Sequence, residues 1–276
     1  MHSTDNLPLG KTSEYVNTYK PSLLCGLLRS DGREHLGISG DNLPFQGVDI
    51  WNAYELSWLE LTGKPVVAVA EIKVPASSPY MVESKSLKLY LNSFCHTSFE
   101  NRHDVGETIE LDLSVLVRSP VSVRIILPDE SLHVFSRTKV PGLCIDALEI
   151  ETDVYSLNRD LLQIEHMAGH VSEVLHSHLL RSNCPVTSQP DWGTLVVEYQ
   201  GDKINHQSLL KYIISYRNHD GFHEQCVEQI FMDIKRCCKP EYLSVYARYT
   251  RRGGIDINPY RSDSQITANN FSTFRQ

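Results

Sequence analysis

VESKSLKLYLNSF (82–94) and INHQSLLKYIISY (204–216) align with each other without a gap, and this pair decides how the chain is organised. Serine, leucine, tyrosine and serine recur at the paired positions 86/208, 87/209, 90/212 and 93/215. Residues that recur at a fixed offset indicate a duplicated structural unit. The sequence therefore predicts two copies of one module.

The segments around the two stretches follow the same order in both halves. In the first half, apolar patterns predict strands over 56–61, 65–74 and 121–127 and helices over 83–99 and 105–117. In the second half, they predict strands over 194–200 and 242–250 and helices over 206–219 and 222–238. A proline, Pro120 or Pro240, follows the second helix of each half, as expected where a helix ends. We expect an α+β protein built from two antiparallel ββααββ modules.

Charge and composition narrow the classes of ligand. The 276 residues carry a formal net charge of −8 and have a pI of about 5.8, which argues against binding to a nucleic-acid backbone. No apolar run approaches the ~18 residues of a membrane span, and the first residues lack a signal-peptide pattern. We therefore expect a cytoplasmic protein that acts on a small molecule, with neither a nucleic-acid nor a membrane partner.

Cysteine and histidine are plentiful but do not form a familiar metal-binding spacing. The seven cysteines are scattered without a CxxC pair, and none of the twelve histidines belongs to an HExxH motif. His176 and His178 are two residues apart, and on a helix they would lie on different faces. The sequence predicts neither a disulfide framework nor a metal site.

SNCPVTSQPDWGT (182–194) places Cys184 and Asp191 at the two ends of a proline-containing loop. A loop thiol near hydrogen-bond donors can act as a thiolate nucleophile, although most cysteines are inert packing residues. Asp191 is either a turn residue or, if Trp192 removes water from its carboxyl group, a proton donor. These residues alone leave both interpretations open.

Polar residues at the starts of two predicted helices are further candidates. His223 and Glu224 begin the helix over 222–238, where the helix dipole alone can explain a carboxylate, but Glu224 could also bind the N–H groups of a purine-like ring. Ser84 and Lys85 begin the first-half helix, either as a cap and a solvated lysine or as phosphate ligands.

Arg251-Arg252-Gly253-Gly254 is the one basic cluster in the chain. It is either a solvated turn or a grip for a small phosphorylated ligand. No GxGxxG motif follows a predicted strand, so a dinucleotide would need a site unlike the Rossmann site.

ESKSLKLYLNSF (83–94) resembles the signature of the NADPH-dependent nitrile reductases that act on 7-cyano-7-deazaguanine, the QueF family. NCPVTSQPDWGT (183–194), GFHEQCVEQI (221–230) and YARYTRRGGIDINPYRS (246–262) resemble other motifs of that family. The resemblance implies the long form with a tandem tunnelling fold (T-fold), with helices on one face of each sheet. It implies an N-terminal extension over 1–35, an N-terminal module over 36–140 and a C-terminal module over 141–276.

The resemblance also implies a role for each motif residue. Cys184 matches the thiol that adds to the nitrile carbon and forms a covalent thioimide, and Asp191 matches the acid that protonates the nitrogen. The residues that match substrate contacts are Val82, Glu83, Ser84, His223 and Glu224. The residues that match NADPH contacts are Ser84, Lys85, Arg252 and Gly253. No metal is implied, and a homodimer is the implied assembly.

The expected activity is the four-electron reduction of 7-cyano-7-deazaguanine to 7-aminomethyl-7-deazaguanine, with two NADPH per turnover, in the biosynthesis of the tRNA base queuosine. One alternative is a non-redox T-fold hydrolase of pterins or purines, which needs zinc or a catalytic histidine set. Another is a purine-binding module without turnover, which would bind its ligand without Cys184 and Asp191.

Overall fold

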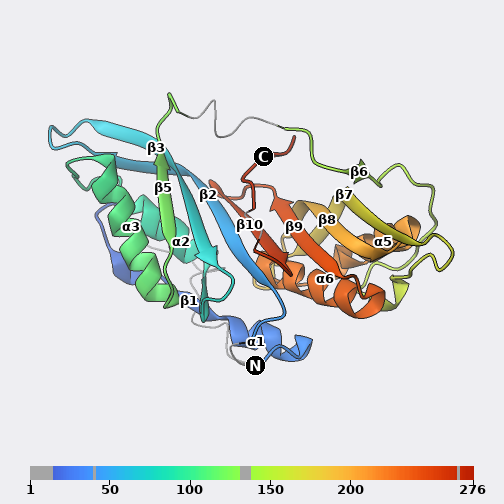
Figure 1. Cartoon of the computed structure of the whole chain (residues 1–276). Helices are drawn as coiled ribbons and strands as arrows, with labels where there is room; N and C mark the ends of the chain where they lie inside the picture. The colour runs from blue at the N-terminus through green and yellow to red at the C-terminus, as the bar shows by residue number, and fades with distance from the viewer. Residues whose placement is uncertain (1–14, 40–41, 131–137, 266–267) are drawn as a thin grey trace. The chain divides into compact units, whose positions relative to one another are not determined.

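The computed structural model describes residues 15–39, 42–130, 138–265 and 268–276, and its contacts divide the chain into two units (Figure 1). Unit 1 consists of Met1–Asn42, Val48–Ser136 and Arg251–Ile257, and unit 2 consists of Leu43–Gly47, Arg137–Thr250 and Asn258–Gln276. Residues 1–14 of the expected N-terminal extension and residues 131–137 of the expected first module lie outside the described residues. In the described part of the chain, no helix is both long enough and apolar enough to cross a membrane.

Unit 1 contains an antiparallel sheet, a separate strand pair, two long helices and one short helix. Its main strands are β2 (Gln46–Leu59), β3 (Pro65–Pro75) and β5 (Ser122–Ile126), in the order β5-β3-β2. A separate pair joins β1 (Gly26–Leu28) to β4 (Tyr80–Val82). The helices are α2 (Ser84–Asn92), α3 (Arg102–Val117) and the short α1 (Arg29–Arg33).

The core of unit 1 lies between one face of this sheet and helices α2 and α3. Strand β3 buries every second residue from Ala68 to Val74, as expected for one face of a strand. Helix α3 buries every fourth residue from Val105 to Val117, which forms a single apolar stripe. The core of unit 1 therefore combines every second residue of this part of β3 with every fourth residue of α3.

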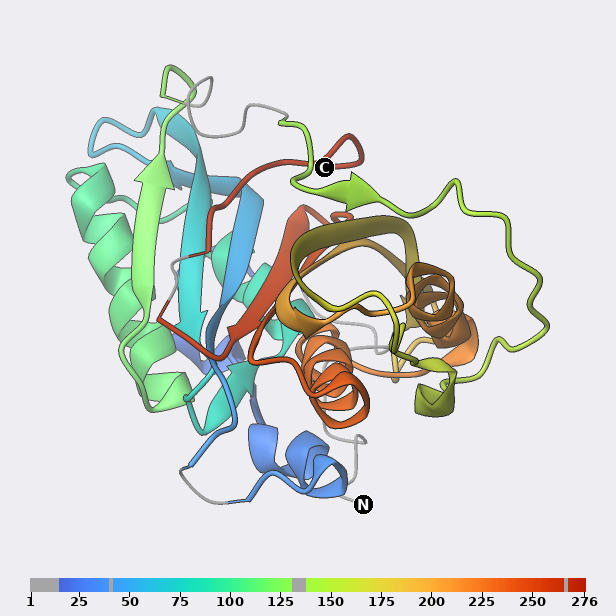
Figure 2. The same cartoon turned by 45° about the vertical axis from the view of Figure 1, so that its right-hand side comes forward.

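Unit 2 contains a longer antiparallel hairpin and two further helices. Its strands are β6 (Leu143–Cys144), β7 (His170–Asn183), β8 (Pro190–Asp202), β9 (Tyr242–Tyr249) and β10 (Ile255–Ser262), of which the first three residues of β10 belong to unit 1. Their order is β10-β9-β8-β7-β6, and only β6 runs parallel to its neighbour. Helices α5 (His206–Ile214) and α6 (His223–Cys238) lie along one face of this sheet (Figures 1 and 2).

The expected α+β class with antiparallel sheets is confirmed, and unit 2 shows the full ββααββ order. Two predicted helices are too long: α2 ends at Asn92, and the helix expected over 206–219 ends at Ile214 and continues as a 3-10 turn, Ser215–Asn218. A serine marks each end, and the Oγ of Ser93 and that of Ser215 each donate over 2.6 Å to the carbonyl three residues earlier.

The serines near the starts of the repeated helices make matching contacts. The Oγ of Ser86 accepts a hydrogen bond from the backbone N–H of Cys25 at 3.0 Å, and the Oγ of Ser208 accepts one from the N–H of Gln163 at 3.1 Å. In both units, a segment that precedes the sheet in sequence is thus fixed to the first turn of the first helix. The repeat seen in the sequence is confirmed as a repeat of hydrogen bonds.

The repeated tyrosines also have equivalent partners. Tyr90 donates to Asp112 over 2.6 Å, and Tyr212 donates to Asp233 over 2.8 Å, so each tyrosine joins the two helices of its unit. Burial is the main cause that raises the pKa of both phenols well above the usual 10. Both tyrosines therefore remain hydrogen-bond donors at any physiological pH.

A bulge occurs at the same place in the first hairpin of each unit. The register of β2 against β3 shifts between Ala53 and Leu56, and that of β7 against β8 shifts between Ser177 and Leu180. In each case, two residues of the first strand face one residue of the second, which defines a β-bulge.

Helices α3 and α6 both end on a residue in the left-handed region. Arg118 has φ 55° and Lys239 has φ 49°, although neither is glycine. A side chain in this conformation has its Cβ too close to the following carbonyl oxygen, so both positions are strained.

We expect Lys239→Gly to raise the free energy of unfolding by about 0.5–1 kcal/mol, because glycine removes this strain but adds unfolded-state entropy. Urea unfolding followed by circular dichroism measures the change. The matched control is Lys211→Gly within α5, which should lower the free energy of unfolding by about 1 kcal/mol. Equal effects of the two substitutions would contradict the left-handed conformation of Lys239.

Candidate active site

The turn between β7 and β8 positions Cys184. The last pair of the hairpin is Asn183 with Pro190, after which the N–H of Cys184 donates to the carbonyl of Gln189 over 2.9 Å. The carbonyl of Cys184 accepts from the N–H of Ser188, also at 2.9 Å. The turn therefore spans only 184–189, and Cys184 is 93% buried, with 7% of its surface exposed.

Asp191 lies in strand β8 rather than in a loop, so the expectation of a long loop over 182–194 is wrong. It pairs with Ser182, while the next residue, Trp192, pairs with Arg181. Because neighbouring side chains of a strand point to opposite faces, Trp192 does not cover the carboxyl group of Asp191. The indole instead lies near the guanidinium carbons of Arg181 and Arg217, at 5.7 and 5.6 Å from its centre.

The partner of Asp191 is His223, the first residue of α6. The Nε2 of His223 lies 3.4 Å from an Oδ of Asp191, and only 13% and 12% of the two side chains are exposed. The imidazole is stacked on Tyr249, with ring centres 3.7 Å apart and planes inclined by 3°. Tyr249 therefore fixes the plane of the histidine ring, a role that the sequence analysis did not assign to it.

Two backbone hydrogen bonds fix the approach to α6 beside the Cys184 turn. The N–H of Asn183 donates to the carbonyl of His219 at 2.8 Å, and the N–H of Gly221 donates to the carbonyl of Asn183 at 3.1 Å. Helix α6 begins two residues later, with Glu224 in its first turn and only 3% exposed. The positive end of the helix dipole stabilises a carboxylate at this position.

The register also relates Cys184 to Asp191. Asp191 pairs with Ser182, and Cys184 comes two residues after Ser182, where the hairpin turns and its N–H bonds to the carbonyl of Gln189. If this register continued into the turn, it would place Cys184 and Asp191 on one face.

Cys226, in helix α6, is a second thiol of unit 2, and its environment is different. It is fully buried, and burial is the main cause that raises its pKa to about 12. It is therefore an inert thiol at neutral pH.

We expect Cys226 to resist alkylation by iodoacetamide at pH 9, where an ordinary thiol with a pKa of about 8.5 is mostly thiolate. The exposed Cys144 should react under the same conditions and serves as the internal control. Peptide mass spectrometry measures both residues, with and without denaturant. Modification of Cys226 in the folded protein would contradict this environment.

The predicted residues of unit 1 lie around the start of α2. Glu83, rather than Ser84, caps the helix, because its carboxylate accepts from the N–H groups of Lys85 at 2.8 Å and Ser86 at 2.7 Å. The interpretation of Ser84 as the cap is therefore wrong, and Ser84 is the first helical residue. Val82 is buried in the core of unit 1.

Arg252 and Gly253 belong to a tight hairpin turn of the same unit. Gly253 and Gly254 have φ 57° and 73°, and the N–H of Ile255 donates to the carbonyl of Arg252 at 3.4 Å, as in a type I′ turn. Glycine is favoured at 254 because its φ of 73° strains other residues, and a Cβ there would lie 2.4 Å from the carboxyl carbon of Glu55.

This turn lies against α2, because a Cβ at Gly253 would be 3.3 Å from the side chain of Lys88. Lys88 follows Lys85 by three residues, so both lysines lie on one side of the helix. Between the turn and the helix is a pocket of about 50 Å³, lined in part by Lys88, Gly253 and Asn92. The sequence analysis missed Lys88, although its spacing from Lys85 was a usable signal.

The cationic side chains of Lys85, Lys88 and Arg252 suit a phosphate group. Of the three, only Lys88 lines the pocket, together with the acidic Glu55, and the pocket is far smaller than the several hundred Å³ of a typical pocket for a whole ligand. The residues present therefore fit a point of contact for the phosphate of NADPH rather than an enclosing cleft.

Two family models match this chain. One, described as nitrile reductase, 7-cyano-7-deazaguanine-reductase N-term, matches residues 15–125, and one described as QueF-like protein matches residues 190–268. Together they cover more than half of the sequence. The chain belongs to the QueF family. This family consists of nitrile reductases of queuosine biosynthesis. The chain is therefore assigned to the oxidoreductases that process a small molecule.

A solved structure, that of the archaeosine synthase QueF-Like in the apo form, aligns with 36% of this chain and 96% of its own, at 20% identity and a TM-score of 0.31. The two QueF-family matches contain every predicted site residue except Cys184, which lies between the matched ranges. Its place in the site depends on the Cys184 turn and on the sequence motif.

Proposed function

We propose that this QueF-family chain reduces 7-cyano-7-deazaguanine to 7-aminomethyl-7-deazaguanine with two NADPH per turnover. The observation that carries the proposal is the arrangement of unit 2, where the Asp191–His223 pair lies at the end of the hairpin whose turn begins at Cys184. A thiol and a carboxyl group on one face suit addition to a polarised triple bond, because one bonds to carbon while the other protonates nitrogen.

Glu224 is suited to orient the substrate. Its buried carboxylate has two acceptor oxygens, and the guanine-like edge of a deazaguanine offers neighbouring N–H donors. His223, held in plane by Tyr249, contacts the substrate from the next position. In the proposal, Val82, Glu83 and Ser84 complete the substrate contacts, as the resemblance implies.

Cys184 begins the reaction. Cys184 adds as the thiolate: its sulfur forms a bond to the nitrile carbon, one π bond of the nitrile breaks, and Asp191 transfers a proton to the nitrogen. The product is a thioimide on Cys184, whose carbon accepts a hydride more readily than a nitrile does. His223 lies within reach of the carboxylate that Asp191 leaves after this transfer, and can stabilise its charge when protonated.

NADPH, when bound, supplies hydride, and Ser84, Lys85, Arg252 and Gly253 would hold it together with Lys88. After the thioimide carbon has taken one hydride, its bond to the sulfur breaks and Cys184 leaves as a thiolate. The resulting imine takes a second hydride and a proton to become the amine. The low exposure of Cys184 limits access of water to the imine, which would otherwise hydrolyse.

The proposal places this reaction in the cytoplasm and in a homodimer, as the resemblance implies. Light scattering of the purified chain measures the assembly, and a monomer that turns over at full rate would remove the dimer from the proposal.

We expect Cys184→Ala to abolish NADPH oxidation and the covalent adduct, because no other group supplies the sulfur. Absorbance of reduced cofactor measures the first, and intact-protein mass spectrometry with the nitrile alone measures the second. Cys95→Ala is the matched control and should retain both. An adduct that persists in Cys184→Ala would assign the nucleophile to another residue, and no NADPH oxidation by the folded wild-type protein would favour the hydrolase or the binding module.

We expect Asp191→Asn to lower kcat by about 10²–10⁴-fold, because the amide keeps the shape of the carboxyl group but cannot transfer a proton. Substrate affinity, measured by calorimetry, should change much less than kcat, since Glu224 remains. An unchanged kcat would exclude Asp191 as the acid.

A further inference from the structure

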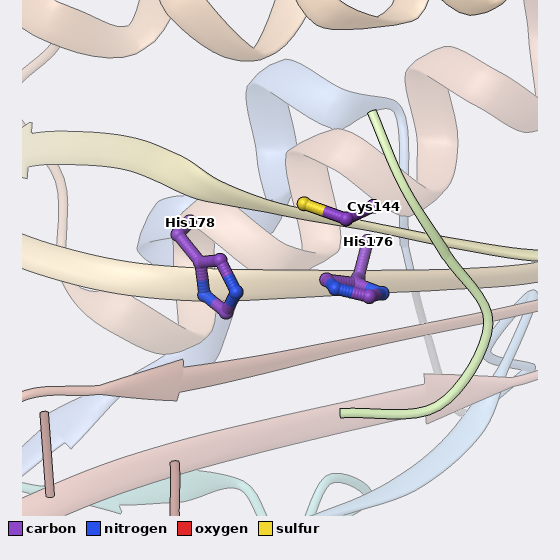
Figure 3. Close-up of side chains that lie close together, drawn as sticks. All are labelled: Cys144, His176 and His178. Atoms are coloured by element: carbon purple, nitrogen blue, oxygen red, sulfur yellow. The ribbon is translucent and has the colours of Figure 1, made fainter. Parts of the chain in front are cut away.

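Three potential metal ligands lie together in unit 2, and none has a role in the proposed reduction. The sulfur of Cys144 and one nitrogen each of His176 and His178 all lie within 4.8 Å of one another (Figure 3). Cys144 comes from β6 and is paired directly with His176 of β7. Two chain segments more than thirty residues apart therefore supply the group.

The strand explains why the two histidines act together. On a helix His176 and His178 would lie on different faces, but both residues belong to strand β7, and their rings lie side by side. The ring centres are 5.3 Å apart, and the bulge of β7 begins immediately after Ser177.

In both histidines, the Nδ1 atom of the ring already has a hydrogen-bond partner. The Nδ1 of His176 lies 2.9 Å from the carbonyl of Pro141, to which it can only donate, and this fixes the tautomer with a lone pair on Nε2. The Nδ1 of His178 lies 2.9 Å from the Oγ1 of Thr194. Histidines that bind metals are usually held through their other ring nitrogen in this way.

The segment that carries Cys144 is held close to β7. Gly142 has φ 81°, and a Cβ there would lie 2.0 Å from the carbonyl oxygen of Val174, so no side chain fits. Beside the group is an open pocket of about 420 Å³, lined by the three ligands and by Phe274 among others. An ion can therefore enter, and water can complete its coordination.

We propose that Cys144, His176 and His178 bind a divalent metal ion of the zinc class, with water as the fourth ligand. Thiolate and imidazole are the ligands that zinc prefers, and three protein ligands plus water make a tetrahedral site. Zinc–ligand bonds of about 2.0–2.3 Å require ligand atoms about 3.5 Å apart, so the group must contract by roughly 1 Å. The exposed side chain of Cys144 can provide this movement by rotation.

The bound ion would fasten the segment around Cys144 to the edge of the unit 2 sheet, where β6 contributes only two residues. The site does not depend on the proposed nitrile reduction, and nitrile reduction does not require it. Removal of the ion should therefore leave the chemistry of Cys184 intact.

The test is titration of the full-length, reduced, metal-free protein with Co²⁺ and Zn²⁺ in the absence of oxygen. We expect one equivalent of Co²⁺ to produce thiolate-to-cobalt charge-transfer absorption, which one equivalent of Zn²⁺ removes. Cys144→Ser should abolish this absorption, and His176→Ala should weaken Zn²⁺ binding by about tenfold or more. In the unaltered protein, Zn²⁺ should protect Cys144 from iodoacetamide, a readout that no folding defect can affect.

His170→Ala is the matched control, because His170 is a half-exposed histidine of the same strand and lies 3.6 Å from Glu241. It should bind Zn²⁺ as the unaltered protein does. Binding without charge-transfer absorption, equal weakening by His170→Ala, or no protection of Cys144 would each overturn the proposal.

Discussion

The candidate active site depends on a pair of hydrogen bonds made by one residue. The N–H and the carbonyl of Asn183 both bond to the segment 219–221, immediately before the chain turns at Cys184 and before α6 begins. These bonds are between backbone groups, so they do not depend on which side chains the site carries. Loss of this contact would separate the thiol from the helix that carries His223 and Glu224, although each element could still fold.

The repeat was the part of the fold that the sequence predicted best. Serine and tyrosine at fixed positions of a short helix have specific hydrogen-bonding tasks, and Ser86 and Ser208 perform the same one in both units. Such residues resist replacement because a buried partner would be left unsatisfied. Helix lengths were predicted less well, because the apolar periodicity continues past Ser93 and Ser215, where the helices end.

In the site, the types of residue could be predicted, but their secondary structure could not. Asp191 was assigned to a loop because Pro190 precedes it, yet proline is compatible with the first residue of a strand. Strand β7 was not predicted at all, because its bulge interrupts the alternation on which strand prediction relies. The same omission concealed the group of Cys144, His176 and His178, which exists only when β6 is paired with β7.

The bulge in β7 lets one strand contribute to two sites. In a regular strand, the faces of the residues at one end would fix the faces of those at the other. Before the bulge, His176 faces the segment of Cys144, and after it the strand leads through Ser182 and Asn183 to the active-site turn. Loss of one residue at the bulge would invert every side chain on one side of it, since pairing alternates with a period of two. The extra residue thus determines which face the side chains at one end of β7 take relative to those at the other end. A deletion there would invert these faces, whereas a substitution would leave them unchanged.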